Sequence, residues 1–249
     1  MPIFEVNQLS KSFGGLRAIS DVTFSVERRT ISSLIGPNGA GKTTAFSLIT
    51  GFLKPDSGQV LFQDQNITGW SPFRIVNLGI ARTFQDVRIL SRLTVQENIL
   101  VGLREMHQQG LLQSILWGQN AKMKMMDKAW QLVEYVGLKA VAAELAEDVS
   151  YAEQKLIILA RALATDPQLL LLDEPVSGLD QASIENMMAL LRRLVKEGKT
   201  VFLVEHNMDV VIRISDYIIV LDFGKKIASG SPDEIRRNEK VIQAYLGTT

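Results

Sequence analysis

One segment constrains the fold of this 249-residue chain more than any other: GPNGAGKTT, residues 36–44. It directly follows the predicted strand ISSLI and opens a segment with a helical pattern. Its glycines allow successive backbone N–H groups to converge on phosphate oxygens, and a helix N-terminus adds a favourable dipole. Gly36, Gly41, Lys42 and Thr43 have the spacing of a phosphate-binding loop, whose lysine reaches the phosphates and whose threonine holds Mg²⁺. A glycine-rich turn alone would not need Lys42 and Thr43, so we predict a nucleotide site.

A second motif, LLLLDEP at residues 169–175, places two carboxylates at the end of an apolar strand. In a parallel sheet such a strand end lies beside the phosphate loop. We therefore expect Asp173 to support the Mg²⁺ shell and Glu174 to polarise an attacking water as a general base. A helix cap after a buried strand is the alternative, and the presence of the phosphate loop favours the catalytic interpretation.

Two further polar residues follow predicted strands. His206, in VFLVEHNMD, is expected at the same sheet edge, where it could hydrogen-bond the γ-phosphate and align water with Glu174. A lone histidine is more often structural, but this position favours the catalytic role. Gln85, in ARTFQD, could complete Mg²⁺ coordination and sense the γ-phosphate, and a solvated loop glutamine is the alternative.

Composition limits the remaining possibilities. Lysine plus arginine equals aspartate plus glutamate at 27 each, so no overall field favours nucleic acid. The chain has no cysteine, which excludes a disulfide scaffold and a thiolate metal site. Its N-terminus, MPIFEVNQLS, lacks the pattern of a signal peptide, and no apolar run approaches the roughly 18 residues of a membrane helix. We therefore expect a protein on the cytoplasmic side whose membrane contact goes through a partner.

The pattern of apolar residues predicts an α/β fold with a helical subdomain. Residues 1–85 and 165–249 read as the nucleotide-binding core, with a mostly parallel sheet and an antiparallel part. Residues 86–164 read as helical, and no role follows for the insert 104–130. A helix over 181–197, a hairpin in YIIVLDFGKKIA and one last helix opened by SPDE complete the chain.

The segment VSYAEQKLIILARAL, residues 149–163, opens a predicted helix. Ser150 and Glu153 form a capping-box pair, in which each side chain satisfies a backbone donor at the helix start. Leu156, Leu159, Ala160 and Leu163 recur at helical spacing and predict one buried face.

Together these motifs resemble those of the ATP-binding cassette (ABC) ATPases, and the resemblance covers essentially the whole chain. Besides the phosphate loop, LLLLDEP and VEHNMD, the chain has SKSFGG, where Phe13 matches the aromatic that stacks on adenine. In SGLD, Asp180 matches a loop that crosses between subunits, and Gln85 matches the glutamine loop. GIARTFQDVRILSRLTVQENILVG and the ending VIQAYLG are similar to ATP-binding subunits of branched-chain and other hydrophobic amino acid importers. Urea transporters and lipopolysaccharide exporters share parts of this pattern.

The resemblance also gives residues 149–153 a second role. In the family this segment is a signature, commonly Leu-Ser-Gly-Gly-Gln, that meets the ATP held by the other subunit. Here Ser150, Tyr151, Ala152 and Glu153 occupy it. Because glycine allows a closer backbone approach than alanine, we expect Ala152 to weaken or slow closure of the composite site. Arg29 and Thr30 stand where the family usually has Gly-Glu, a change expected to matter little for mechanism.

The resemblance implies ATP and Mg²⁺ as cofactors and a head-to-tail pair of ATPase subunits, identical or different. It also implies permease subunits and, indirectly, an external solute-binding protein, with the chain peripheral on the cytoplasmic side of the cell membrane. The implied ATP-binding residues are Phe13, Gly36, Pro37, Asn38, Gly39, Ala40, Gly41, Lys42, Thr43, Thr44 and Gln85; Glu174 and His206 are implied in catalysis, and Thr43, Gln85 and Asp173 in holding Mg²⁺.

Other classes fit less well. A regulatory GTPase would need a guanine-reading Asn-Lys-x-Asp, which does not occur. A small-molecule kinase would leave SYAEQ, SGLD and VEHNMD as coincidences. A cassette protein acting on ribosomes or DNA gains nothing from the neutral charge. We therefore expect an ATPase that drives uptake of branched-chain or other neutral amino acids, with a urea or lipopolysaccharide transporter as the alternative.

Overall fold

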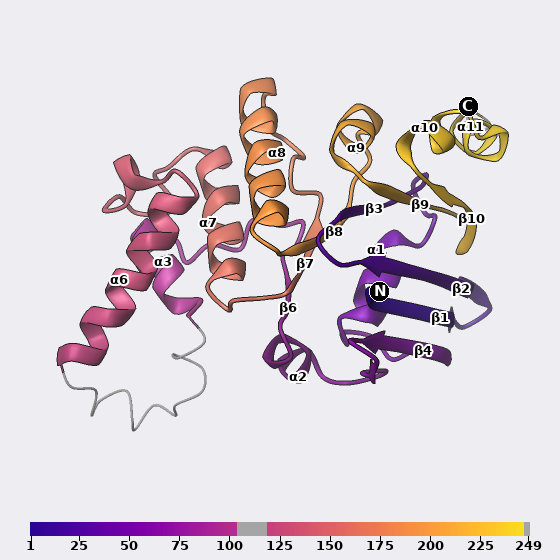
Figure 1. Ribbon diagram of the computed structural model, residues 1–249, viewed down its shortest axis with the longest axis horizontal. Coiled ribbons are helices and arrows are strands. Elements are labelled where there is room, and N and C mark those ends of the chain that lie inside the picture. The colour runs from indigo at the N-terminus through magenta and orange to yellow at the C-terminus, as the bar shows by residue number, and fades with distance from the viewer. Residues whose placement is uncertain (104–118, 247–249) are drawn as a thin grey trace. The chain divides into compact units, whose positions relative to one another are not determined.

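The computed structural model describes residues 1–103 and 119–246, which group into two compact units (Figure 1). The first, called the sheet unit, comprises residues 1–82, 168–175 and 191–249. The second, called the helical unit, comprises residues 83–167 and 176–190. The sequence prediction placed residues 176–190 in the core instead. Part of the insert, residues 104–118, and the last residue of the VIQAYLG ending, Gly247, lie outside the described residues.

The strands are β1 Pro2–Phe13, β2 Leu16–Glu27, β3 Ile31–Ile35, β4 Ser57–Phe62, β5 Gln65–Asn66, β6 Ile80–Arg82, β7 Leu169–Asp173, β8 Thr200–Val204, β9 Tyr217–Asp222 and β10 Lys225–Gly230. The helices are α1 Lys42–Ile49, α2 Pro72–Asn77, α3 Val95–Val101, α6 Gln119–Tyr135, α7 Tyr151–Leu163, α8 Gln181–Lys196, α9 Met208–Ile214, α10 Pro232–Arg236 and α11 Glu239–Leu246, with a 3₁₀ turn over Lys139–Val141.

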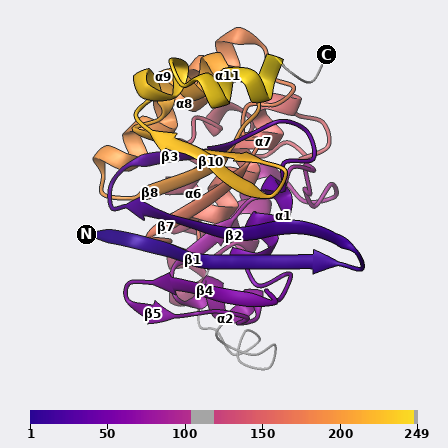
Figure 2. The same ribbon diagram turned by 90° about the vertical axis from the view of Figure 1, so that its right-hand side faces the viewer.

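Both sheets belong to the sheet unit (Figure 2). The first is antiparallel with strand order β2-β1-β4-β5. The second has the order β10-β9-β3-β8-β7-β6, and every pair in it is parallel except the β9–β10 hairpin. The predicted combination of a mostly parallel sheet and an antiparallel part is therefore present.

The two sheets share a hydrophobic core with α1. All five residues of each of β3, β7 and β8 are buried, as expected for a parallel sheet covered on both faces. The strands β7 and β8 are mostly apolar, whereas β3 also buries Ser32 and Ser33. Phe46 of α1 and Phe24 of β2 both contact Phe202 of β8, with ring centroids 5.3 and 5.4 Å apart. On the other side of the parallel sheet a second cluster joins β3 and β9 to the helices α9, α10 and α11.

The helical unit packs α3, α6 and α7 around a smaller core that includes Leu103, Met125 and Ala164. Thr94 caps α3 by accepting a hydrogen bond from the Glu97 amide while the Glu97 carboxylate accepts one from the Thr94 amide. Within residues 1–103 and 119–246, no helix combines the length and the apolar composition that crossing a bilayer requires.

Three details differ from the sequence prediction. The buried face of α7 is made by Ile157, Leu159, Ala160 and Leu163, and Leu156 is only half-buried. The predicted single last helix is two helices, because Asn238 accepts amide hydrogen bonds from Lys240 and Val241 and so starts α11 afresh. β1 and β2 are 12 residues each, longer than the strands IFEVN and VTFSV that the sequence predicts there, because β-bulges let them continue past irregular positions.

Candidate active site

The parallel sheet brings the predicted motifs to one edge. Leu34 of β3 pairs with Val204 of β8, and Val204 pairs on its other side with Asp173 of β7. Because the three strands are parallel and in this register, the segments that follow them leave the sheet at the same edge. These segments are the phosphate loop, Glu174 and His206.

The phosphate loop, residues 36–41, packs so closely against neighbouring backbone that two of its glycines have no substitute. A Cβ on Gly36 would lie 2.1 Å from the Leu221 carbonyl oxygen, and one on Gly41 would lie 2.7 Å from that of Ala18. Gly41 also has φ of 98° and directly precedes α1, whose first residues are Lys42 and Thr43. The remaining predicted phosphate-binding residues lie in the loop (Pro37, Asn38, Gly39 and Ala40) and in the first turn of α1 (Thr44), and their binding of phosphate stays a prediction.

The Lys42 ammonium lies within the loop. Its Nζ donates hydrogen bonds to the carbonyl oxygens of Gly36 and Pro37 at 2.7 and 3.0 Å. Burial lowers the pKa of Lys42, and the negative charges of Glu174 and Asp173 partly oppose that shift. Lys42 therefore belongs to the same electrostatic site as the two carboxylates of LLLLDEP, as the sequence predicts.

Glu174 and His206 approach each other at the sheet edge. His206 Nδ1 lies 3.5 Å from Glu174 Oε1; the Glu174 side chain is 17% exposed and that of His206 is 56% exposed. The Glu174 amide donates to the Val204 carbonyl at 3.0 Å, and Glu174 has a left-handed backbone with φ of 49°. Non-glycine residues held in this region are strained and gather at active sites. The arrangement suits a general base with a histidine beside it.

Asp173 has a partner that the sequence analysis missed. Its side chain is 6% exposed, and its Oδ2 accepts a hydrogen bond from Arg82 Nη2 at 3.1 Å. Arg82 ends β6, the strand next to β7. The one available signal was the arginine at the end of the apolar stretch GIA, and nothing local says that such an arginine is buried.

Phe13, the predicted adenine-stacking residue, ends β1 and is 45% exposed. The Lys11 ammonium lies 5.7 Å from the centre of its ring. An exposed aromatic face of this kind can stack on a base, and that role stays a prediction.

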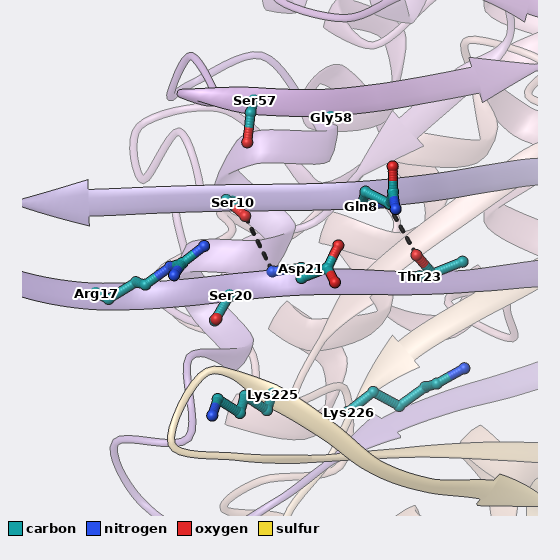
Figure 3. A pocket seen from close by; sticks show the side chains of 10 residues that line it. All are labelled: Gln8, Ser10, Arg17, Ser20, Asp21, Thr23, Ser57, Gly58, Lys225 and Lys226. Carbon is teal, nitrogen blue, oxygen red and sulfur yellow. Dashed lines mark hydrogen bonds between the residues drawn. The ribbon is translucent and has the colours of Figure 1, made fainter.

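A hollow of about 690 Å³ lies elsewhere on the sheet unit, over the outer side of β1, β2 and β4 and beside β10 (Figure 3). Its floor is shaped by left-handed backbone at Gln8 and Asp21, whose amides donate to Thr23 Oγ1 and Ser10 Oγ, both at 2.9 Å. None of the predicted site residues lines this hollow, so it is distinct from the phosphate site.

In the helical unit, α7 begins with the predicted capping box. Ser150 Oγ accepts from the Glu153 amide at 3.3 Å, and the Ser150 amide donates to Glu153 Oε2 at 2.8 Å. Tyr151, Ala152 and Glu153 form the first turn of α7, and Ser150 and Tyr151 are exposed. The first amides of α7 therefore carry the partial positive charge of a helix start next to an exposed hydroxyl.

Replacing Ser150 with alanine should destabilise the nucleotide-free protein. The substitution removes the acceptor of the Glu153 amide, so we expect the free energy of unfolding to fall by about 1 kcal/mol. Urea denaturation followed by circular dichroism measures this. Ser150→Asn, which keeps a side-chain acceptor, should retain most of the stability. Equal stability of the alanine and asparagine variants would contradict the capping role.

The signature segment contacts the SGLD loop within the helical unit. Gly178 has φ of 76°, and a Cβ there would lie 3.0 Å from Cε1 of Tyr151. Asp180, two residues later, caps α8 by accepting a hydrogen bond from the Ser183 amide at 2.8 Å, and this bond lowers the pKa of Asp180. The tyrosine therefore packs on a loop that only glycine fits, a contact between two motifs that sequence spacing does not reveal.

Gln85 also belongs to the helical unit. It is exposed and lies in a bend that follows Thr83. Its predicted roles toward Mg²⁺ and the γ-phosphate stay predictions.

Comparison with known proteins identifies the family. The family described as ABC transporter matches residues 19–177, and the one described as branched-chain amino acid ATP-binding cassette transporter matches residues 225–249. The high-affinity branched-chain amino acid transport ATP-binding protein LivG of Escherichia coli (strain K12) is 39% identical over 250 residues. That alignment covers 99% of this chain and 98% of the relative.

Solved structures agree. An ATP-binding cassette of an ABC transporter in its ADP conformation matches with a TM-score of 0.88 at 32% identity, covering 99% of both chains. A dimeric bacterial ABC transporter cassette matches with a TM-score of 0.78 at 25% identity, covering 92% of this chain and 98% of the other. The predicted family and fold are thus confirmed, and the chain belongs to the ATP-binding cassette family of ATPases.

Proposed function

We propose that this protein is the ATP-hydrolysing subunit of an importer for branched-chain amino acids. The observation that carries the proposal is the near full-length relationship to LivG, 39% identical over 99% of this chain. The match of residues 225–249 to a branched-chain amino acid cassette family supports the same solute class. These comparisons favour branched-chain amino acids over the urea and lipopolysaccharide alternative.

The sheet unit supplies the groups for the chemical step. Lys42 and the backbone amides of residues 38–41 bind the phosphates, since they precede and open one helix N-terminus. Glu174 accepts the proton of the attacking water, and His206, at 3.5 Å from Glu174, keeps that carboxylate and the water in line. Water attacks the γ-phosphorus, the bond to the β-phosphate oxygen breaks, and the products are ADP and phosphate.

The donor set at this edge fits Mg²⁺. Thr43 offers a hydroxyl and Asp173 a buried carboxylate, and oxygen donors of this kind suit Mg²⁺. Among residues 1–103 and 119–246, no group of three or more histidine, cysteine, aspartate or glutamate side chains gathers as a metal cage. A Mg²⁺ ion here would complete its shell with phosphate oxygens and water, and would neutralise charge on the transferred phosphoryl group.

A second ATPase subunit completes the site in this proposal. Ser150 and the first amides of α7 of the second subunit face the γ-phosphate bound to the other chain, because a helix start with an exposed hydroxyl suits an anion. The dimeric cassette of similar fold supports this arrangement. Loss of the γ-phosphate removes the contact between the halves, so hydrolysis reopens the dimer.

The proposed complex also contains permease subunits, which carry the chain at the cytoplasmic side of the membrane. The amino acid binds to the permease and an external binding protein. Closure of the ATPase dimer is then transmitted to the permease, and nucleic acid has no part in the cycle.

Uptake by living cells tests the proposal. Cells deleted for this chain should regain uptake of labelled leucine, isoleucine and valine when the wild-type chain is restored, and should not regain it with Lys42→Ala, because the phosphates lose their cation. Lys240→Ala, which removes an exposed lysine of α11, is the matched control and should behave as wild type. Restoration of urea uptake with no effect on leucine would contradict the proposed solute.

A further inference from the structure

The ion pair of Arg82 and Asp173 is buried at the active edge of the sheet unit. The two side chains are 8% and 6% exposed, and Arg82 Nη2 donates to Asp173 Oδ2 at 3.1 Å. The pairing depends on strand register, since Arg82 of β6 lies opposite Leu171, two residues before Asp173. Burying two charges costs several kcal/mol of desolvation, and apolar residues at such positions are often at least as stabilising. Stability alone is therefore a weak reason for this pair.

The guanidinium makes a second hydrogen bond, to another element. Arg82 Nη1 donates to Thr50 Oγ1 at 2.8 Å, and Thr50 follows the last residue of α1 and is 3% exposed. The same hydroxyl donates to the Phe46 carbonyl at 2.5 Å, which orients its lone pairs toward Arg82. Phe46 and Phe52 place their rings 5.7 and 5.5 Å from Arg82 Cζ. The arginine is thus fixed in position by α1 and by two aromatic rings.

Arg82 therefore joins the two elements that carry the candidate Mg²⁺ donors. Asp173 ends β7, and Thr43 lies in the first turn of α1, roughly 10 Å along that helix from Thr50. The planar guanidinium has several donors in a rigid fork, so it can hold Asp173 and Thr50 at once, whereas a lysine offers a single point charge on a flexible chain.

We propose that Arg82 is a positioning residue for Mg²⁺: anchored by Thr50, it fixes the direction of the Asp173 carboxylate toward the nucleotide. This inference rests on the proposed role of Asp173 in holding Mg²⁺. Partners that hydrogen-bond metal-binding side chains typically contribute about 10–100-fold to metal affinity. The role is one of geometry, so it requires the fork and its anchor as well as the positive charge.

Calorimetric titration of the full chain with ADP, once with Mg²⁺ and once with EDTA, measures the contribution of the metal as the ratio of the two dissociation constants. Arg82→Lys keeps the charge and should reduce this ratio about tenfold. Thr50→Val removes only the anchor and keeps Arg82 itself, so it should reduce the ratio by a smaller factor, about threefold, below the roughly 10–100-fold range for loss of the partner itself. ADP affinity in EDTA should stay unchanged, since neither substitution touches the phosphate loop.

Two controls accompany these variants. Thr50→Ser retains the hydroxyl and should restore the wild-type ratio. Thr165→Val makes the matched change at the end of α7, where the hydroxyl donates to the Ala162 carbonyl, and should leave the ratio unchanged. If Arg82→Lys does not fold, Thr50→Val against Thr50→Ser decides the question.

A wild-type ratio in Thr50→Val, or in folded Arg82→Lys, would overturn the inference. Asp173→Asn separates this outcome from failure of the proposed metal site. If Asp173→Asn keeps the full ratio, Asp173 does not support Mg²⁺ and the inference falls with it. If Mg²⁺ no longer changes the ADP dissociation constant in Asp173→Asn, while Thr50→Val shows the wild-type ratio, only the positioning role of Arg82 is wrong.

Discussion

Glu174→Gln should slow ATP hydrolysis by about 10²–10⁴-fold while ATP binding is retained. The amide keeps the size of the side chain but cannot accept a proton from water, and general bases contribute about this factor. The Lys42 ammonium and the phosphate loop are untouched, so the dissociation constant for ATP should change little. Steady-state phosphate release and equilibrium ATP binding measure the two effects separately. Glu234→Gln, at the exposed capping box of α10, is the matched control and should hydrolyse ATP at the wild-type rate.

The same variant should accumulate a dimer with ATP and Mg²⁺, because blocked hydrolysis traps the closed state. Light scattering measures the mass with and without nucleotide. If Glu174→Gln stays monomeric, adding Ala152→Gly tests the signature: rescue would assign the defect to Ala152, and no rescue would indicate a different partner ATPase. Turnover near the wild-type rate in Glu174→Gln would contradict its role as the base.

Asp173→Ala should lower the free energy of unfolding by about 3–5 kcal/mol, because it removes the carboxylate that balances the buried Arg82 charge. Urea denaturation of the nucleotide-free protein measures this change. The double variant Arg82→Met with Asp173→Leu should recover most of the loss, since apolar residues can replace a buried pair. If this double variant recovers its stability and its ADP affinity no longer depends on Mg²⁺, the ion pair is needed for metal binding and not for folding.

An exposed ion pair of the same unit provides the comparison. Arg192 Nη1 lies 2.8 Å from Asp216 Oδ1, and the two side chains are 38% and 40% exposed. Arg192→Ala removes this ion pair and leaves the hydrogen bond from the Ile31 amide to Asp216 Oδ2 in place. It should cost no more than about 1 kcal/mol, since water screens exposed charges. Equal losses in Asp173→Ala and Arg192→Ala would contradict the assigned difference in burial.

The sequence could predict the active edge because its signals are local. Uniformly apolar strands identify a parallel sheet, and in such a sheet residues directly after the strands share one edge. Glu174 and His206 follow β7 and β8 in this way, and the structure places them 3.5 Å apart. The phosphate loop likewise stands between a strand and a helix, so its position needed no knowledge of distant contacts.

The contacts that escaped prediction depend on register and backbone shape. Arg82 reaches Asp173 only because β6 pairs with β7 at one particular register. Tyr151 packs on Gly178, more than twenty positions later, and neither motif signals the other. Arg29 shows a related effect: it has φ of 58°, which explains why the family usually has glycine there. The Arg29 backbone adopts this left-handed conformation although the residue has a Cβ.

The left-handed backbone of Glu174 sets conformation against chemistry at one position. Glycine would adopt φ of 49° without strain, so a glycine at this position would relieve the backbone even as it removed the proposed base. A cassette with glycine at position 174 would keep the phosphate loop and Lys42, which we propose bind ATP, and would lack the group proposed to activate water. Such a chain would be expected to bind ATP without hydrolysing it at the normal rate.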